Sequence, residues 1–300
     1  MHIMSANQQQ FLWLILAMFF WGASWPIASI MSAYVDVHEF ITYRYFFVTL
    51  SMAPVLWWMR LSFKIGFIDF VIACIAALFL VLYSNYYFLS VTHGAPGLAG
   101  AVVTTLMPIL VYLLMLFSKQ KKPRFKDWLA LLLAAIGVLI TMGIWQFQLS
   151  EILATGNLYM IAASLSWALV SITSSYAKPL NPLVLSFYIY LITTILDWLL
   201  FFQPTHGSVF AMDGIFWINF VIVSLGSTTF ATTIYFASVH SLGSKKASVF
   251  TFLVPFFALG TSVLFLNETL QWTTFLGVLM TIIALIVLND IKLRPLNKHK

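Results

Sequence analysis

The sequence predicts an all-α polytopic membrane protein with ten transmembrane helices, built as two inverted five-helix repeats. Composition, the spacing of apolar runs and an internal duplication predict it. Of the 300 residues, 62% are hydrophobic and 8% are charged, and the mean hydropathy is +0.97. A soluble domain carries about 25% charged residues, so this chain is too apolar for that class. We expect one membrane domain over residues 1–300.

Apolar runs of the length that a helix needs to cross the hydrocarbon core follow one another with short connections. Residues 1–10 carry no Lys or Arg, and the first run exceeds 20 residues, so we interpret it as a span rather than a signal peptide. The runs cover about residues 11–34, 39–59, 67–91, 95–117, 126–145, 154–176, 182–202, 214–239, 244–266 and 271–290.

The basic residues predict the orientation of these spans. All 15 Lys and Arg residues except Arg44 fall in loops or a tail that share one side of the membrane when the N-terminus is cytoplasmic. Cytoplasmic loops of membrane proteins are enriched in Lys and Arg. We therefore expect both termini in the cytoplasm, and we attribute the net charge of +6 to this bias rather than to nucleic-acid binding.

A duplicated motif divides the chain into two halves, at residues 11–145 and 154–290. Val102, Thr104, Leu106 and Pro108 read V-x-T-x-L-x-P, as do Val249, Thr251, Leu253 and Pro255, and a similar lead-in, YFLSV or YFASV, precedes each copy. Five spans per half make the copies cross in opposite directions. Inverted repeats predict a binding site near the midplane between the halves, and transport by alternating access.

Several short motifs carry a family resemblance: Trp21-Gly22, Ala99 to Pro108, and Leu266-Asn267-Glu268 leading to Gly277. With them the whole chain resembles the EamA family of the drug/metabolite transporter superfamily. The resemblance implies a multi-pass protein of the bacterial inner membrane that moves a small metabolite, often by amino-acid export, without a cofactor. We expect it to act as a monomer. Lys119-Gln120-Lys121-Lys122 departs from the family, which usually has a glutamate there.

Aromatic and neutral polar residues at mid-depth are the candidates for substrate binding. Tryptophan normally favours the membrane interface, so indoles at mid-depth suggest a polar cavity, although tight helix packing would also explain them. Threonine hydroxyls can bond their own helix, whereas a buried asparagine amide is expected to face the protein interior. The lining suits a small, net-neutral, amphipathic molecule such as an amino acid. The candidates are Trp21, Trp25, Asn85, Thr104, Trp167, Thr229, Thr233 and Thr251.

Arg44, Asp197, Pro108 and Pro255 are assigned gating or structural roles. Arg44 lies within a span near the predicted outer surface, so it could snorkel to the headgroups, pair with Asp197, or hold a carboxylate. The prolines are expected to bend their helices. Asp197, and at the margin Glu39, are the acids that could couple transport to protons.

Enzymatic chemistry is disfavoured by the polar residues. No two of the six histidines have metal-ligand spacing, and no Ser, His and Asp set shares one depth. We expect no metal and no catalytic residue. The alternatives left open are a metabolite importer or exchanger of the same fold and, from another class, a membrane-embedded enzyme or lipid-handling protein.

Overall fold

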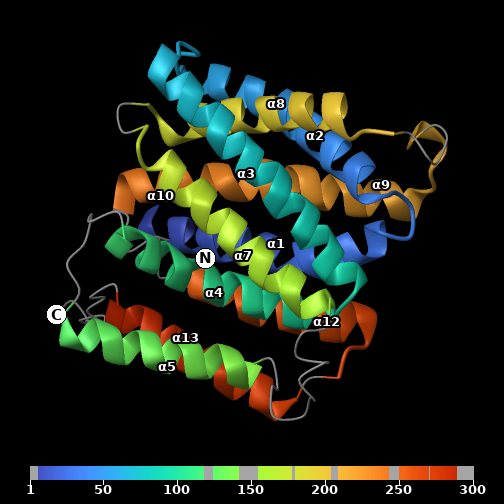
Figure 1. Ribbon diagram of the computed structural model, residues 1–300. Coiled ribbons are helices and arrows are strands. Elements are labelled where there is room, and N and C mark those ends of the chain that lie inside the picture. The colour runs from blue at the N-terminus through green and yellow to red at the C-terminus, as the bar shows by residue number, and fades with distance from the viewer. Residues whose placement is uncertain are drawn as a thin grey trace.

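The computed structural model describes residues 6–117, 124–141, 155–177, 180–203, 209–242, 250–269 and 271–288, and these form helices and their connections, without strands (Figure 1). Each predicted run contains a described helical segment. The α-helices are α1 (Ala6–Met31), α2 (Val37–Trp58), α3 (Phe67–Thr92), α4 (Pro96–Phe117), α5 (Phe125–Thr141), α7 (Thr155–Ser174), α8 (Pro182–Leu200), α9 (Gly214–Val221), α10 (Ala231–Leu242), α12 (Val254–Leu266) and α13 (Trp272–Leu288).

Three short segments complete the helices of the second half. The π-helix η3 (Ile222–Phe230) joins α9 to α10 without a break, so residues 214–242 form one helical run. The 3-10 segments are η2 (Val209–Ala211) and η4 (Thr251–Leu253), and η4 leads directly into α12.

Six helices in the described part of the chain are long and apolar enough to cross a membrane. Their outward faces carry large apolar side chains, such as Phe67, which is 82% exposed, and Ile218, which is 64% exposed. Such exposure opposes folding in water but suits contact with lipid. The chain is therefore a polytopic membrane protein. The six helices are Gln9–Met31, Phe67–Thr92, Pro96–Leu116, Gly156–Ser174, Pro182–Leu200 and Gly214–Ser238.

The helices pack in pairs that the duplication relates to one another. Equivalent helices of the two halves pack together in the pairs α5 with α13, α2 with α8, and α4 with α12. The first of these pairs forms one edge of the molecule and the second forms the opposite edge (Figure 1). The contact of α3 with α7 is mirrored by that of the 214–242 run with α1, and the contact of α1 with α12 by that of α7 with α4. This pattern is what a twofold relation between the halves produces.

The two copies of the V-x-T-x-L-x-P motif adopt different local structures. In the first copy Pro108 lies inside the continuous helix α4. In the second copy Thr251–Leu253 form the 3-10 turn η4, and Pro255 lies in the first turn of α12. A proline in the first turn of an α-helix removes no intrahelical hydrogen bond. Pro255 therefore marks a change of helix type rather than a bend in mid-helix.

Candidate functional site

Arg44 of α2 lies in the interior, among aromatic rings. Its side chain is 8% exposed, and its Cζ lies 5.5 Å from the ring centroid of Phe40 and 5.7 Å from those of Tyr45 and Tyr87. The guanidinium donates to the Thr228 hydroxyl of η3 from Nε at 3.3 Å and from Nη2 at 2.9 Å. Arg44 therefore points to the helix interface and does not snorkel to the lipid headgroups.

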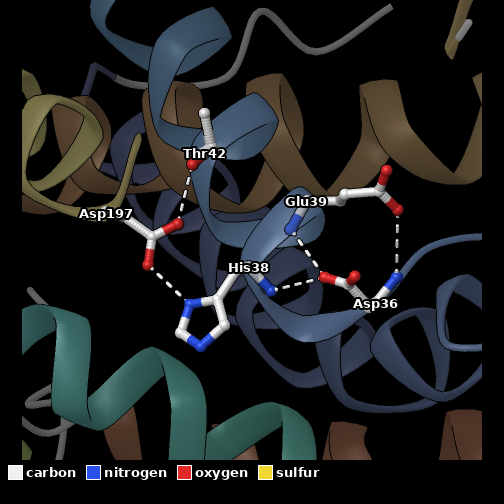
Figure 2. Close-up of polar contacts among 5 residues, drawn as sticks. All are labelled: Asp36, His38, Glu39, Thr42 and Asp197. Carbon is white, nitrogen blue, oxygen red and sulfur yellow. Dashed lines mark hydrogen bonds and ion pairs between the residues drawn. The ribbon is translucent and has the colours of Figure 1, made fainter. Parts of the chain in front are cut away.

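Asp197 is paired with a residue other than Arg44. Its fully buried carboxylate lies 2.8 Å from Nδ1 of His38 and accepts a hydrogen bond of 2.7 Å from the Thr42 hydroxyl (Figure 2). No ion pair in the described part of the chain includes Arg44. The pairing of Arg44 with Asp197 that the sequence left open is not formed.

A capping box explains why α2 begins where it does and so fixes His38. The Asp36 carboxylate accepts from the backbone N–H groups of His38 and Glu39 at 2.9 and 3.0 Å, and Glu39 accepts from the Asp36 N–H at 3.3 Å (Figure 2). These bonds satisfy amide groups that lack partners inside the helix. The His38 ring also stacks on Phe201, with 5.0 Å between centroids. The buried Asp197 is thus held at the joined ends of α2 and α8.

A row of aromatic rings extends from α1 through α3 to α7. Trp25 contacts Tyr87 at 4.6 Å between centroids, Tyr87 contacts Tyr83 at 5.8 Å, and Tyr83 contacts Trp167 at 4.8 Å. Two of the predicted tryptophans therefore lie at the two ends of one row. Tyr87 also contacts Arg44, so the row joins the side chains around this cation. We call the whole set the Arg44 cluster: the four rings of the row, Arg44, its neighbours Phe40, Tyr45 and Thr228, and Tyr190, which stacks on Tyr45.

Trp21 and Trp25 of α1 each contact one member of a duplicated tyrosine pair. Tyr87 and Tyr235 occupy the same position in YFLSV and YFASV. Trp25 contacts Tyr87, whereas Trp21, one turn earlier, contacts Tyr235 at 5.3 Å between centroids. The structure therefore places Trp21 with the second half of the chain, outside the aromatic row.

The π-helix η3 brings threonine hydroxyls to the Arg44 cluster. The Thr228 hydroxyl accepts from Arg44 and donates to the carbonyl five residues earlier at 3.1 Å, and Thr229 shares a hydrogen bond of 2.6 Å with Ser51 of α2. The buried hydroxyl of Thr233, one turn further, bonds to no described group. π-Helices occur frequently at functional sites, because they reposition side chains within a helix.

The other predicted binding residues lie elsewhere or have local partners. The Thr104 hydroxyl donates to the carbonyl four residues earlier at 2.6 Å, as the packing interpretation predicts. Asn85 is half-buried on the flank of α3 that also carries the exposed side chains of Leu78 and Leu82. Thr251 is half-buried in η4. The structure does not bring these three residues into the Arg44 cluster.

Sequence reasoning missed six side chains of the Arg44 cluster. Tyr87 carried two usable signals, since it lies in the duplicated lead-in and one turn from Tyr83. Tyr45 stacks on Tyr190 at 5.3 Å and shares a hydrogen bond of 2.8 Å with Ser84, contacts that join helices distant in sequence. The missed residues are Phe40, Tyr45, Tyr83, Tyr87, Tyr190 and Thr228.

A separate contact joins the halves at the start of α4. The Glu268 carboxylate, which follows α12, accepts from the Gly97 N–H with both oxygens, at 3.0 and 3.1 Å. Partial burial raises the pKa of Glu268 above its ordinary value, and the Gly97 bond opposes part of that rise. Among the described residues no group of three His, Cys, Asp or Glu side chains is placed to hold a metal ion.

Comparisons with known proteins agree with this architecture. The EamA-like transporter family matches residues 9–143 and again residues 154–290. The uncharacterized transporter sll0355 of Synechocystis sp. (strain ATCC 27184 / PCC 6803 / Kazusa) is 27% identical over 215 residues, which are 64% of this chain and 62% of that protein. A crystal structure of a protein shares the fold with a TM-score of 0.63 at 18% identity, over 93% of this chain and 96% of that one.

Proposed function

Because the chain belongs to the EamA-like transporter family, we propose that it is a secondary transporter that exports a small, net-neutral metabolite, an amino acid or a related compound, across the bacterial inner membrane. One observation carries the proposal. The Arg44 cluster draws its side chains from both matched halves, since α2 and α3 belong to the first and α7, α8 and η3 to the second. A site shared by two repeats is the expected location for a transported substrate.

The proposed mechanism is alternating access by exchange of the conformations of two inverted repeats. In this mechanism residues 11–145 and 154–290 are the five-span halves of a single membrane domain. The domain has ten spans, and both termini lie in the cytoplasm. The mirrored packing of the helices supports this arrangement, because the most extensive contacts between helices have counterparts in the other half. We propose that a single chain suffices for transport and that the chain is not an enzyme.

The chemistry of the Arg44 cluster suits an amphipathic molecule. Aromatic rings offer apolar surface, and the threonine hydroxyls of η3 can replace part of a ligand's hydration. Trp25, Trp167 and Thr229 lie within or beside the cluster, and we propose that they contact substrate first. The remaining proposed binding residues are Trp21, Asn85, Thr104, Thr233 and Thr251.

The proposal is tested with the purified protein in liposomes. Liposomes preloaded with one unlabelled amino acid and diluted into the same labelled amino acid should accumulate label transiently, since a carrier exchanges substrate across the bilayer. Alanine, leucine, phenylalanine and glutamine span the sizes to be tested. Protein-free liposomes are the control. If none of the four is exchanged above this control, the proposed substrate class is wrong.

A further inference from the structure

We propose that Arg44 binds the carboxylate of the transported molecule, so that the substrate class is small carboxylates, amino acids among them. The inference rests on the proposed transport function and deepens it, because it names the group that recognises the substrate. It assigns to Arg44 a binding role beyond joining α2 to η3.

The first step is the missing counter-charge. A guanidinium has five N–H donors and carries its charge at any physiological pH. The polar side chains that Arg44 contacts are the hydroxyls of Thr228 and Tyr87, which are neutral acceptors. Burying a charge is costly unless an opposite charge and hydrogen bonds compensate for the loss of water. A carboxylate ligand supplies both, in the two-pronged geometry that matches a guanidinium.

The second step is that the acids of α2, its cap and α8, in the described part of the chain, bond to groups other than Arg44. Asp197 bonds to His38 and Thr42. The Asp36 carboxylate caps the first turn of α2, and the buried Glu39 carboxylate accepts from the Asp36 N–H. An arginine whose task was structural would be stabilised most by a carboxylate from a neighbouring helix. In the described part of the chain the buried acid Asp197 and the buried cation Arg44 belong to separate hydrogen-bond networks. The cation therefore stays available to an anion that enters from outside.

The third step is the position of Arg44 between parts that alternating access must move. Arg44 belongs to the first half, and Thr228 belongs to the π-helix of the second half. A carboxylate that binds Arg44 competes with Thr228 for the same donors, so its arrival alters a contact between the halves. Binding energy can then change the relative stability of two conformations, as a ligand does when it favours one of them.

The aromatic row completes the recognition of an amino acid. Tyr87 contacts both Arg44 and Trp25, so a molecule held by Arg44 lies at the start of a row of ring faces. Those faces attract an ammonium group by cation–π interaction and also accept an apolar side chain. A decarboxylated amine would gain nothing from Arg44 and would meet a like charge there. Discrimination against amines and carboxamides is therefore expected.

The test compares acids with their carboxamides in the liposome exchange assay. The compounds are alanine, leucine, phenylalanine and glutamine, each with its carboxamide. The unlabelled acid should inhibit uptake of the labelled amino acid by the wild-type protein at a concentration about tenfold or more below that of the carboxamide. Hydrogen bonds to charged groups are worth roughly this factor in affinity. Arg44→Met should raise the KM for the acid by at least about tenfold and abolish the preference over the amide. Arg44→Lys, which keeps the charge, should retain part of the affinity for the acid and part of the preference for the acid over the amide.

The controls separate binding from folding and from the proposed function. Arg124→Met removes a half-exposed guanidinium at the start of α5 and should leave KM unchanged. The wild-type comparison needs no variant, so it decides the matter even if Arg44→Met does not fold. If the wild-type protein exchanges amides as well as acids, or Arg44→Met keeps its KM, the role assigned to Arg44 is wrong while transport stands. If the wild type exchanges neither acid nor amide, the proposed function itself fails.

Discussion

The helix that carries Tyr87 and the helix that carries Tyr235 come from the same duplicated sequence, yet they differ in structure and surroundings. α3 is a continuous α-helix, whereas its counterpart, residues 214–242, contains the π-helix η3. Tyr87 contacts the buried cation Arg44 and Trp25, while Tyr235 contacts the neutral rings of Trp21 and Phe236. Within the described part of the chain, the first copy therefore makes a contact with a buried cation that the second copy does not make, although both tyrosines face α1. The duplication preserved the scaffold, and the chemistry diverged.

The packing of α5 against α13 shows the opposite behaviour, since here the copies are still equivalent. Gly137 and Thr141 of α5 face Gly277 and Thr281 of α13, and each threonine hydroxyl donates to the carbonyl of its own glycine at 2.9 Å. Small residues let helix backbones approach closely in a membrane. Two equivalent helices that pack closely both need small residues at the contact, so the same residues serve in both copies. A binding site for an asymmetric molecule does not require the same residues in both copies.

The largest expected effect comes from substitutions that break this equivalent pair. A Cβ at Gly277 would lie 2.4 Å from the Thr141 backbone nitrogen, and one at Gly137 would lie 2.8 Å from the Gly277 carbonyl oxygen. Gly277→Ala and Gly137→Ala should therefore each destabilise the protein by about 1–3 kcal/mol, the usual range for overpacking. Thermal unfolding in detergent, followed by tryptophan fluorescence, measures the loss.

Gly260 of α12 provides the matched control for these two substitutions. A Cβ there would meet nothing within 4 Å, so Gly260→Ala should leave the melting temperature unchanged or raise it slightly. Losses of similar size at Gly137 and Gly277 would support the equivalence of the two copies. A loss at one glycine alone would show that the α5–α13 pair is not symmetric in energy.

The helices could be predicted from the sequence because a bilayer leaves few options. Backbone groups in the hydrocarbon must bond within their own segment, so each long apolar run becomes a helix. Some described helices agree with the predicted runs to within two residues, for example Phe67–Thr92 for 67–91 and Pro182–Leu200 for 182–202, whereas α1 begins five residues before its predicted run. The π-helix η3 could not be foreseen, because its register depends on contacts with α2, such as that between Thr229 and Ser51.

The site was harder to predict because apolar spans hide which side chains face one another. Trp25 and Trp167, two of the tryptophans singled out at mid-depth, lie at the two ends of one aromatic row, and their role in substrate binding stays a prediction. Depth alone suggested a pairing of Arg44 with Asp197, but the rotation of α2 turns His38 and Thr42 toward Asp197 and Arg44 toward η3. The depth of a residue in the membrane follows from its position in the sequence, whereas the rotation of a helix about its axis follows from its packing against other helices.

A smaller effect should distinguish the two duplicated tyrosines. The Tyr87 hydroxyl donates to the Ser24 carbonyl at 2.6 Å and contacts Arg44, whereas the Tyr235 hydroxyl bonds to no described group. Tyr87→Phe leaves a buried carbonyl without its partner and should cost about 1 kcal/mol or somewhat more. Tyr235→Phe should change stability by less than half of that. Equal losses in the same unfolding assay would contradict the asymmetry between the copies.

The smallest expected effect concerns Glu268, whose contact with Gly97 joins the second copy to the first. The pKa of Glu268 is raised in the folded protein, because partial burial disfavours the ionised carboxylate. A raised folded-state pKa means that the stability due to this group is complete below its ordinary pKa and is lost as the pH rises through the folded value. Glu268→Gln, which stays neutral, should therefore gain melting temperature relative to the wild type between pH 4 and pH 7, by a few degrees at most. A difference that stays constant over this range would mean that the Gly97 bond compensates the ionised carboxylate fully, and that the contact between the halves is insensitive to protons.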